Sequence, residues 1–420
     1  MRGSSLLDRA LRGADVFDVP DDPRQSEIFE AFAQLGHDFH ESLRLSQWGR
    51  FPVAGGADDG TVRVQNAPAA PFVYDPSTFF HRTAGTVFQR KNFAVNPGQP
   101  WAQVDLPQVG VIDRIILQFV GTLTVGVAAS TSTPLWPYGL LENVQFTADG
   151  STNLVNVRGI VLKELERIRY PGSINNNDDL IGPGIGGGLN LPVGVTNLRL
   201  TYEIPLSFDD AMMVGAVFAQ SRQLSIALNG KDAAVTRIAT AGGGGTQVIA
   251  GNWNVLVKTF KIPADNGKMI LPDLRVLHSL VEIQQNIAGT GPQKQAFNRV
   301  GGSLQRAIVS DLQKNADPVV FYNPATAADV SEYDLIWGAN EIPYAYNPAQ
   351  ALLSRNVRDY GDKLPYGAVC LDLARWNSLR DALNLSAITE LYWQTIINTT
   401  APDASGGTQY LTQESLIQAA

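Results

Sequence analysis

Residues 203–211 read Glu-Ile-Pro-Leu-Ser-Phe-Asp-Asp-Ala, and residues 341–349 read Glu-Ile-Pro-Tyr-Ala-Tyr-Asn-Pro-Ala. The two stretches share Glu, Ile, Pro and the closing Ala, and each has an aromatic residue at the same place, Phe208 or Tyr346. A short match such as this can arise by chance, but the segments on either side also match, which favours duplication. A duplicated unit predicts two similar β domains in tandem.

The segment around the first copy predicts a strand, a corner and a helix. Large apolar residues alternate through Leu198–Ile204, which is typical of a strand with one buried face. Pro205 has no N–H for a ladder, so the strand is expected to end or to reach a sheet edge there. Asp209 can cap a short helix that runs to Val217, and another strand is expected over Gln223–Asn229.

The second copy predicts the same order of elements. Asn347 can cap a helix whose first residue is Pro348, where the missing N–H costs little, and the helix runs to about Arg358. A strand is expected over Gly367–Leu373. The corners of the repeated unit are Pro205, Phe208 and Asp209 in the first copy and Pro343, Tyr346 and Asn347 in the second.

Composition favours a β protein with more than one domain. The chain has 420 residues, more than a single core usually organises. Gly (39) and Pro (24) are plentiful and only 17% of residues are charged, which fits short strands joined by turns. The net charge of −8 disfavours direct binding of nucleic acid, which depends on Lys and Arg. Cys370 is the one cysteine, so no internal disulfide is possible, as expected for synthesis in a reducing cytoplasm.

The N-terminal segment is expected to be helical. Residues 1–17 can form a small amphipathic helix that lies on a membrane surface. The alternatives are a frayed terminus or a helix that packs on a neighbouring subunit. A longer helix begins at Asp22-Pro23 and has an apolar stripe opposite an acidic face, so it is expected to pack on protein. The candidate membrane-facing residues are Arg2, Leu6, Leu7, Arg9, Leu11 and Arg12.

The fold class predicted from these patterns is all-β with short helices: two tandem eight-stranded jelly rolls preceded by an N-terminal helix. One helix is expected inside the first roll, over Gly159–Tyr170, because its apolar residues have helical spacing. The predicted domains are residues 1–90 as an N-terminal helical arm and extended segment, 91–240 as the first jelly roll, 241–251 as a Gly-rich linker, 252–400 as the second jelly roll and 401–420 as a peripheral tail.

Few residues have the spacing that catalysis or metal binding requires, so no catalytic, cofactor or metal site is expected. Gly182, Gly184 and Gly187 satisfy G-x-G-x-x-G, but no helix follows them, as a dinucleotide site would need. His37 and His40 lack a third metal ligand at a fitting spacing. The amides and acids of residues 175–179 are more typical of a solvated loop than of a calcium site, and Cys370 is more typical of a buried structural thiol than of a nucleophile.

Two parts of the chain resemble a known family. The run from Thr201 to Phe208, Gly215–Val217 and the run from Ser221 to Ile226 are similar to the first jelly roll of tectivirus-type major capsid proteins of membrane-containing double-stranded DNA bacteriophages. Residues 364–370 resemble the equivalent place in the second roll. The order of parts agrees over about residues 90–400. The resemblance implies a double jelly-roll subunit that forms trimers, and the trimers tile an icosahedral shell over an internal membrane.

The leading hypothesis is therefore a non-enzymatic virion protein, made in the host cytoplasm, whose mechanism is self-association. Its expected partners are itself as a homotrimer, neighbouring capsid trimers, penton or minor capsid proteins and lipid of the internal membrane, without direct contact to nucleic acid. The alternative is a phage spike or another carbohydrate- or receptor-binding β-sandwich protein. A hydrolase built on a β scaffold ranks last, because neither a triad nor a carboxylate pair occurs in a motif.

Overall fold

The computed structural model describes residues 72–420, apart from residues 151, 172–184, 210–211, 221–224, 266, 288, 299–301, 315–319, 339–340, 376–377, 380, 386–387, 389, 400–406 and 419–420. Several predictions lie outside the described residues. They concern the N-terminal helices, the candidate membrane-facing residues Arg2, Leu6, Leu7, Arg9, Leu11 and Arg12, the pair His37 and His40, the glycines Gly182 and Gly184, and residues 175–179.

The first jelly roll, called roll 1, has one sheet of long antiparallel strands. Strand β4 (Val111–Gly126) pairs with β9 (Gly194–Pro205) on one side and with β13 (Thr246–Phe260) on the other, and β2 (Gly85–Ala94) pairs with β13. Alternate residues of β4 face the core, so this strand has the period of two that a half-buried sheet requires.

The second sheet of roll 1 faces the first across the largest hydrophobic core. Its strands, in spatial order, are β3 (Val104–Asp105), β11 (Ile226–Asp232), β6 (Leu141–Ala148) and β7 (Thr152–Val157). Trp253 lies at the centre, with ring centroids 5.2–5.6 Å from those of Trp101, Phe119 and Tyr202. Such buried rings account for much of the burial that stabilises a sandwich, about 1.5–3 kcal/mol for each fully buried apolar side chain.

The second jelly roll, called roll 2, repeats this two-sheet plan. One sheet has β16 (Val276–Ile287), β25 (Gly407–Gln418) and β18 (Gly302–Lys314), and three short strands share the outer side of β18: β19 (Val320–Phe321), β22 (Val369–Asp372) and β23 (Leu383–Asn384). The facing sheet has the order β17 (Gly291–Ala296), β24 (Leu391–Ile397), β20 (Val330–Trp337) and β21 (Glu341–Tyr346).

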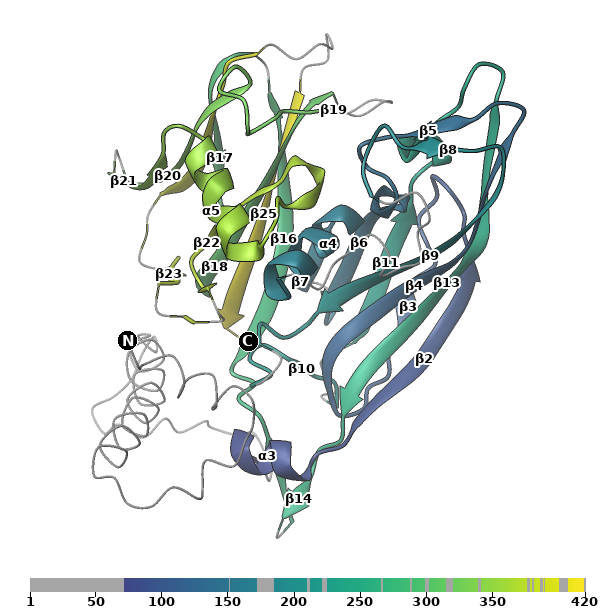
Figure 1. Ribbon diagram of the computed structural model, residues 1–420. Helices are drawn as coiled ribbons and strands as arrows, with labels where there is room; N and C mark the ends of the chain where they lie inside the picture. The colour runs from purple at the N-terminus through teal and green to yellow at the C-terminus, as the bar shows by residue number, and fades with distance from the viewer. Residues whose placement is uncertain are drawn as a thin grey trace, which may run out of the picture. The chain divides into compact units, whose positions relative to one another are not determined.

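The two rolls share one continuous sheet. Strand β7 of roll 1 pairs in parallel with β16 of roll 2 through two residue pairs, Leu280 with Val155 and Val281 with Asn156. A single ten-stranded sheet therefore crosses the junction, which is called the seam below (Figure 1). The predicted fold class, all-β with two jelly rolls and short helices, is confirmed.

Short helices, turns and strands connect the long strands of the rolls. The helices are α3 (Pro76–Arg82), α4 (Gly159–Arg169) and α5 (Gln350–Tyr360), and the 3-10 turns are η2 (Tyr138–Leu140), η3 (Val235–Arg237) and η4 (Pro365–Gly367). The remaining strands are β1 (Phe72–Tyr74), β14 (Ala264–Asp265) and β15 (Lys268–Leu271) in one small sheet, β5 (Ser130–Ser132), β8 (Asn190–Leu191) and β12 (Ala239–Thr240) in another, and β10 (Val217–Phe218) beside β4. Among the helices that the structure describes, none has the length and apolar content needed to cross a membrane.

Three predicted segments differ from the structure. Residues 401–420, expected to form a peripheral tail, contain β25, which lies buried between β16 and β18. Residues 241–251, expected to be a linker, overlap β13 from Thr246 onward. Gly251 faces Gly121 so closely that a Cβ on Gly251 would lie 2.6 Å from the Cα of Gly121, so this glycine serves close strand approach. Residues 85–90, expected to belong to the extended segment before the first jelly roll, are part of strand β2 of that roll.

The repeated unit also differs in detail. The helix α4 is confirmed, and α5 and β22 follow the second copy as predicted. In the first copy, residues 212–216 form turns that lead into β10, and Asp209 accepts a 3.1 Å hydrogen bond from the N–H of Met212 without starting a helix there. Asn347 does not cap α5, because its amide donates to Glu332 at 3.0 Å and the N-cap residue is Ala349.

Candidate functional site

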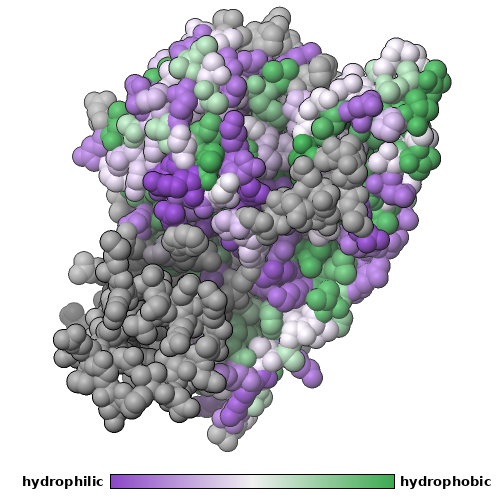
Figure 2. Space-filling model, in the orientation of Figure 1, coloured by the Kyte–Doolittle hydropathy of each residue, from purple (hydrophilic) through white to green (hydrophobic). Residues whose placement is uncertain are grey.

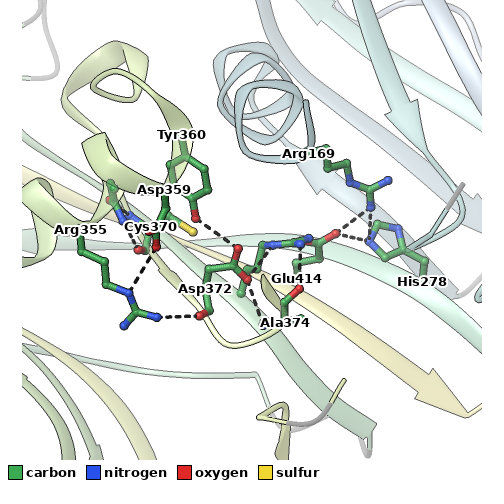
Figure 3. A network of polar contacts seen from close by, with 11 residues as sticks. Arg169, His278, Arg355, Asp359, Tyr360, Cys370, Asp372, Ala374 and Glu414 are labelled. Atoms are coloured by element: carbon green, nitrogen blue, oxygen red, sulfur yellow. Dashed lines mark hydrogen bonds and ion pairs between the residues drawn. The ribbon is translucent and has the colours of Figure 1, made fainter. Parts of the chain in front are cut away.

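A network of buried charges lies at the seam (Figure 3). Its centre is Glu414 on β25, a carboxylate with no exposed surface. Arg169 donates to Oε1 of Glu414 at 2.8 Å, and Arg306 donates to Oε2 at 2.8 Å. Nε2 of His278 lies 2.9 Å from Oε1. Each oxygen of this carboxylate therefore has a charged or polar partner, which a buried ion needs.

The three partners of Glu414 come from different elements. Arg169 is the last residue of α4, which belongs to roll 1, whereas Arg306 on β18 and His278 on β16 belong to roll 2. Alternate residues of β16, β18 and β25 point to one face of the sheet, so these polar side chains meet beside the apolar core. The network thus connects the two rolls through one carboxylate.

Part of the first Glu-Ile-Pro stretch closes the network from the roll 1 side. Nδ1 of His278 lies 3.0 Å from the carbonyl oxygen of Pro205, and Arg169 donates to the carbonyl oxygen of Ser207 at 3.0 Å. The guanidinium of Arg306 lies 5.2 Å from the ring centroid of Phe208. These contacts hold residues 205–208 against β16 and β18.

The network continues into roll 2 as a chain of hydrogen bonds. Arg306 donates to Oδ1 of Asp372 at 3.1 Å, and the hydroxyl of Tyr360 donates to Oδ2 at 3.3 Å. The amide of Asn356 donates to the carbonyl oxygen of Cys370 and accepts from its N–H, both at 2.7 Å. Helix α5 is thereby fixed to β22 in the way that α4 is fixed to β25.

Burial and the neighbouring charges shift the pKa values of Glu414, His278 and Cys370. Burial alone would raise the pKa of Glu414, but Arg306 and Arg169 outweigh it and hold that pKa well below its usual value. Burial lowers the pKa of His278, and the nearby Glu414 opposes this shift. Burial also raises the pKa of the Cys370 thiol far above neutrality, which disfavours a thiolate.

A second charged pair crosses the seam. Arg158, the residue before α4, donates to both oxygens of Glu282 on β16 at 2.7–3.0 Å. Its guanidinium lies 3.5 Å from the ring centroid of Tyr410 on β25. A bidentate pair that is also stacked on an aromatic ring fixes both distance and orientation. We therefore interpret the seam as a structural joint.

The seam also contains a cavity of about 680 Å³. Residues of β6, β7 and β16 line it, and the lining includes the amides of Asn143, Asn156 and Gln284 and the charged side chains of Glu282 and Arg237. Among the described residues, no group of three or more His, Cys, Asp or Glu side chains could hold a metal ion.

Exposed apolar side chains gather at one end of roll 1. Val195 on β9 and Val248 on β13 are both register partners of Thr124 on β4, so the three residues form a row across the sheet. Val127 and Val193 lie exposed just beyond these strands. Figure 2 shows apolar surface at the end of roll 1 near β5 and β8. An apolar row of this kind is more typical of an interaction surface than of free solvent-facing sheet.

The structure brings together only part of the predicted corner set. Pro205 and Phe208 contact the seam network, and Asp209 lies at the turn that follows. Pro343, Tyr346 and Asn347 lie on or next to β21, at the other end of roll 2. Gly187, the described member of the glycine motif, packs against Pro134.

Sequence reasoning missed Arg169, Arg306, His278 and Glu414 as members of one site. The available signal was charge inside strand patterns. Arg306 interrupts the apolar run of β18, and Glu414 lies three residues after Leu411 and two before Leu416 in the buried strand β25. Buried charges are rare unless paired, so these positions called for partners.

No protein-family model matches the chain, and no curated protein matches it. Solved structures do match. The chain is 19% identical to the major capsid protein in the crystal structure of the STIV MCP, covering 80% of this chain and 97% of that one with a TM-score of 0.59. It is 18% identical to a chain in the atomic structure of Sulfolobus Turreted Icosahedral Virus, covering 80% and 91% with a TM-score of 0.59. It is 12% identical to VP54 of PBCV-1, covering 80% and 93% with a TM-score of 0.54.

These structures define the class of fold. They are double jelly-roll major capsid proteins, and the alignment covers nearly the whole of each of them. At such low identity the likeness establishes the fold, so the chain is a double jelly-roll protein, as the resemblance to tectivirus-type proteins predicted.

Proposed function

We propose that this chain is the major capsid protein of a virus, a structural subunit that assembles as homotrimers into an icosahedral shell over an internal membrane. The observation that carries the proposal is the double jelly-roll fold, which this chain shares with the STIV and PBCV-1 capsid proteins. In this role the protein is part of the virion and is made in the host cytoplasm.

The geometry supports a role based on rigidity and contact. The seam holds roll 1 and roll 2 together through paired buried charges. The two rolls of a subunit can therefore act as one rigid unit when each contacts a neighbouring subunit. The exposed valines Val195 on β9 and Val248 on β13, in register with Thr124 on β4, offer area to bury between subunits. The proposed partners are further copies of the chain, penton or minor capsid proteins and membrane lipid.

Purification of the full chain tests this proposal. Light scattering coupled to size-exclusion chromatography should give the mass of a trimer, and negative-stain images should show particles with a hexagonal outline. A protein that stays monomeric at all accessible concentrations and in the presence of lipid vesicles would contradict the assembly role.

A second candidate function is recognition of a carbohydrate receptor. The observation that favours it is the seam cavity, because its amides, carboxylates and arginines offer both donors and acceptors to a hydroxylated ligand. Screening the full chain on a glycan array tests it. Glycan binding that is lost in Gln284→Ala, with an unchanged oligomeric state, would support this function. Absence of binding to any glycan on the array would contradict it.

A further inference from the structure

A pocket of about 200 Å³ lies between α4 of roll 1 and the segment of roll 2 that follows α5. Lys163 and Arg167 line it from α4, the helix that Figure 1 shows between the two rolls. Lys363 lines it from the segment between α5 and η4. Three cations from two distant parts of the sequence therefore meet at one small pocket, although the chain as a whole has a net charge of −8.

The two cations on α4 are close together and shielded from solvent. The side chain of Lys163 is 5% exposed and that of Arg167 is 12% exposed. They are four positions apart on the helix, so they lie on the same face, where like charges repel each other. The ammonium group of Lys163 lies 4.5 Å from the ring centroid of Tyr138, which also lines the pocket. Shielded cations in this arrangement favour an anion beside them.

The acidic residues near the pocket neutralise it only in part. Glu166 accepts a hydrogen bond from Lys163 at 2.8 Å. Asp362 lies 3.6 Å from Arg167, and its side chain is 71% exposed, so this ion pair is long and weak. Lys363 is exposed and forms no ion pair within the described part of the chain. Three cations thus face two carboxylates, and one of these carboxylates points largely to solvent.

A second pocket, of about 170 Å³, lies at the C-terminal end of α4 and is also lined by arginines. Its acids, in contrast, are buried. Asp372 accepts from Arg306 at 3.1 Å, and Asp359 lies 3.0 Å from Arg375. The side chains of these two acids are 3–5% exposed, so their charge stays at the pocket and repels an anion. The pocket beside the exposed Asp362 is therefore the one that suits an anion.

We propose that the pocket formed by Lys163, Arg167 and Lys363 binds one free tetrahedral oxyanion, inorganic phosphate or sulfate. The planar guanidinium of Arg167 donates to two oxygens of the ion, and the two ammonium groups supply the remaining positive charge. A volume of about 200 Å³ holds such an ion with a few waters, each of about 30 Å³. It is smaller than the about 300–1,000 Å³ of sites for drug-sized ligands. The bound ion connects α4 of roll 1 to roll 2 and stabilises the seam.

Isothermal titration calorimetry of the purified full chain with sodium phosphate, at constant ionic strength in sodium chloride, tests the site. One ion should bind per chain. Lys363→Gln should weaken this binding by about tenfold, because it removes one charged donor. Its side chain is exposed, so the variant should fold, which circular dichroism checks. Lys268→Gln, which removes an exposed cation on β15, is the matched control and should bind phosphate like the wild type.

The other outcomes separate the candidate ligands and pockets. Sulfate should displace phosphate, and phosphate should raise the midpoint of thermal unfolding more in the wild type than in Lys363→Gln. Phosphate binding that phosphatidylglycerol vesicles displace would overturn a free ion in favour of a lipid headgroup. A larger loss in Arg375→Gln than in Lys363→Gln would place the ion in the second pocket and overturn the assignment.

Absence of binding to both phosphate and sulfate, or wild-type affinity in Lys363→Gln, also overturns the inference. The site does not depend on self-assembly, because one chain supplies all three cations. A monomeric chain that binds phosphate would therefore contradict the proposed function and leave this inference standing, whereas a trimer that binds no oxyanion would do the reverse.

Discussion

Glu414 and Asp311 are buried carboxylates on neighbouring strands of the same sheet, yet their surroundings are opposite. Glu414 on β25 receives hydrogen bonds from two arginines and lies beside His278 at the seam. Asp311 on β18 lies inside roll 2, where Gln409 donates to Oδ1 at 3.0 Å and Oδ2 has no hydrogen-bond partner. One end of the strand pair thus holds a compensated charge and the other an uncompensated one.

The difference gives the two acids opposite effects on stability. The pKa of Glu414 is held well below its usual value, so its ionised form stabilises the fold and that contribution is lost as pH falls. Burial raises the pKa of Asp311 to about 7, so its ionised form destabilises the fold and the cost appears as pH rises. The seam is therefore more stable with Glu414 ionised, whereas the interior of roll 2 is more stable with Asp311 protonated.

The largest effect is expected from Glu414→Gln. This substitution leaves Arg169 and Arg306 buried without their shared counter-ion, which typically costs about 3–5 kcal/mol. Urea unfolding of the full chain at pH 7 measures the loss. Glu142→Gln is the matched control, because Glu142 pairs with Lys231 at an exposed site, and it should change the free energy of unfolding by less than about 0.5 kcal/mol. Equal losses in the two variants would show that the seam network does not hold the rolls.

Asp311→Asn should have the opposite sign. The native carboxyl binds its proton more tightly than the unfolded one, so stability falls with pH between the ordinary value of 3.8 and about 7 and is flat above. An uncharged amide removes this slope and should add about 2–4 kcal/mol at pH 8. Urea unfolding between pH 5 and 8 measures it, and Asp265→Asn, at an exposed site, is the control. A variant that keeps the wild-type slope would assign the slope to another group.

The class of fold could be predicted from the sequence because the alternation of apolar residues in a strand is visible in consecutive positions of the chain. The long strands follow from the period of two that a half-buried sheet face requires, and the helix over Gly159–Tyr170 follows from the helical spacing of its apolar residues. The tandem arrangement was predicted from the repeated Glu-Ile-Pro stretch. The tail was missed because β25 does not alternate polar with apolar residues: it is buried along residues 407–417, and polar side chains such as Gln413 and Glu414 have partners far away in the chain. No local pattern contains that information.

The two Glu-Ile-Pro stretches also show that local sequence does not determine burial. Ile204 is fully buried in β9 beside β4, whereas Ile342 is 48% exposed at the edge of roll 2. Identical residues therefore have different environments, because pairing partners decide burial. The seam network could not be predicted from the sequence for the same reason, because Arg169 and Glu414 are 245 positions apart.

Asp334→Asn is expected to have the smallest effect on stability, and it tests whether other buried acids of roll 2 behave like Asp311. Asp334 on β20 is buried like Asp311 but has an acidic neighbour, so burial and then Glu332 raise its pKa to about 6. The amide of Gln394 donates to Oδ2 at 2.8 Å and offsets part of the cost, so the expected gain is about 1 kcal/mol at pH 8. Glu332→Gln removes the neighbouring charge and should lower the midpoint of the pH profile that Asp334 causes. If Asp334→Asn instead destabilises the protein at pH 8, the attraction between Lys294 and ionised Asp334 outweighs the cost of burial, and uncompensated charge on these two acids is confined to Asp311.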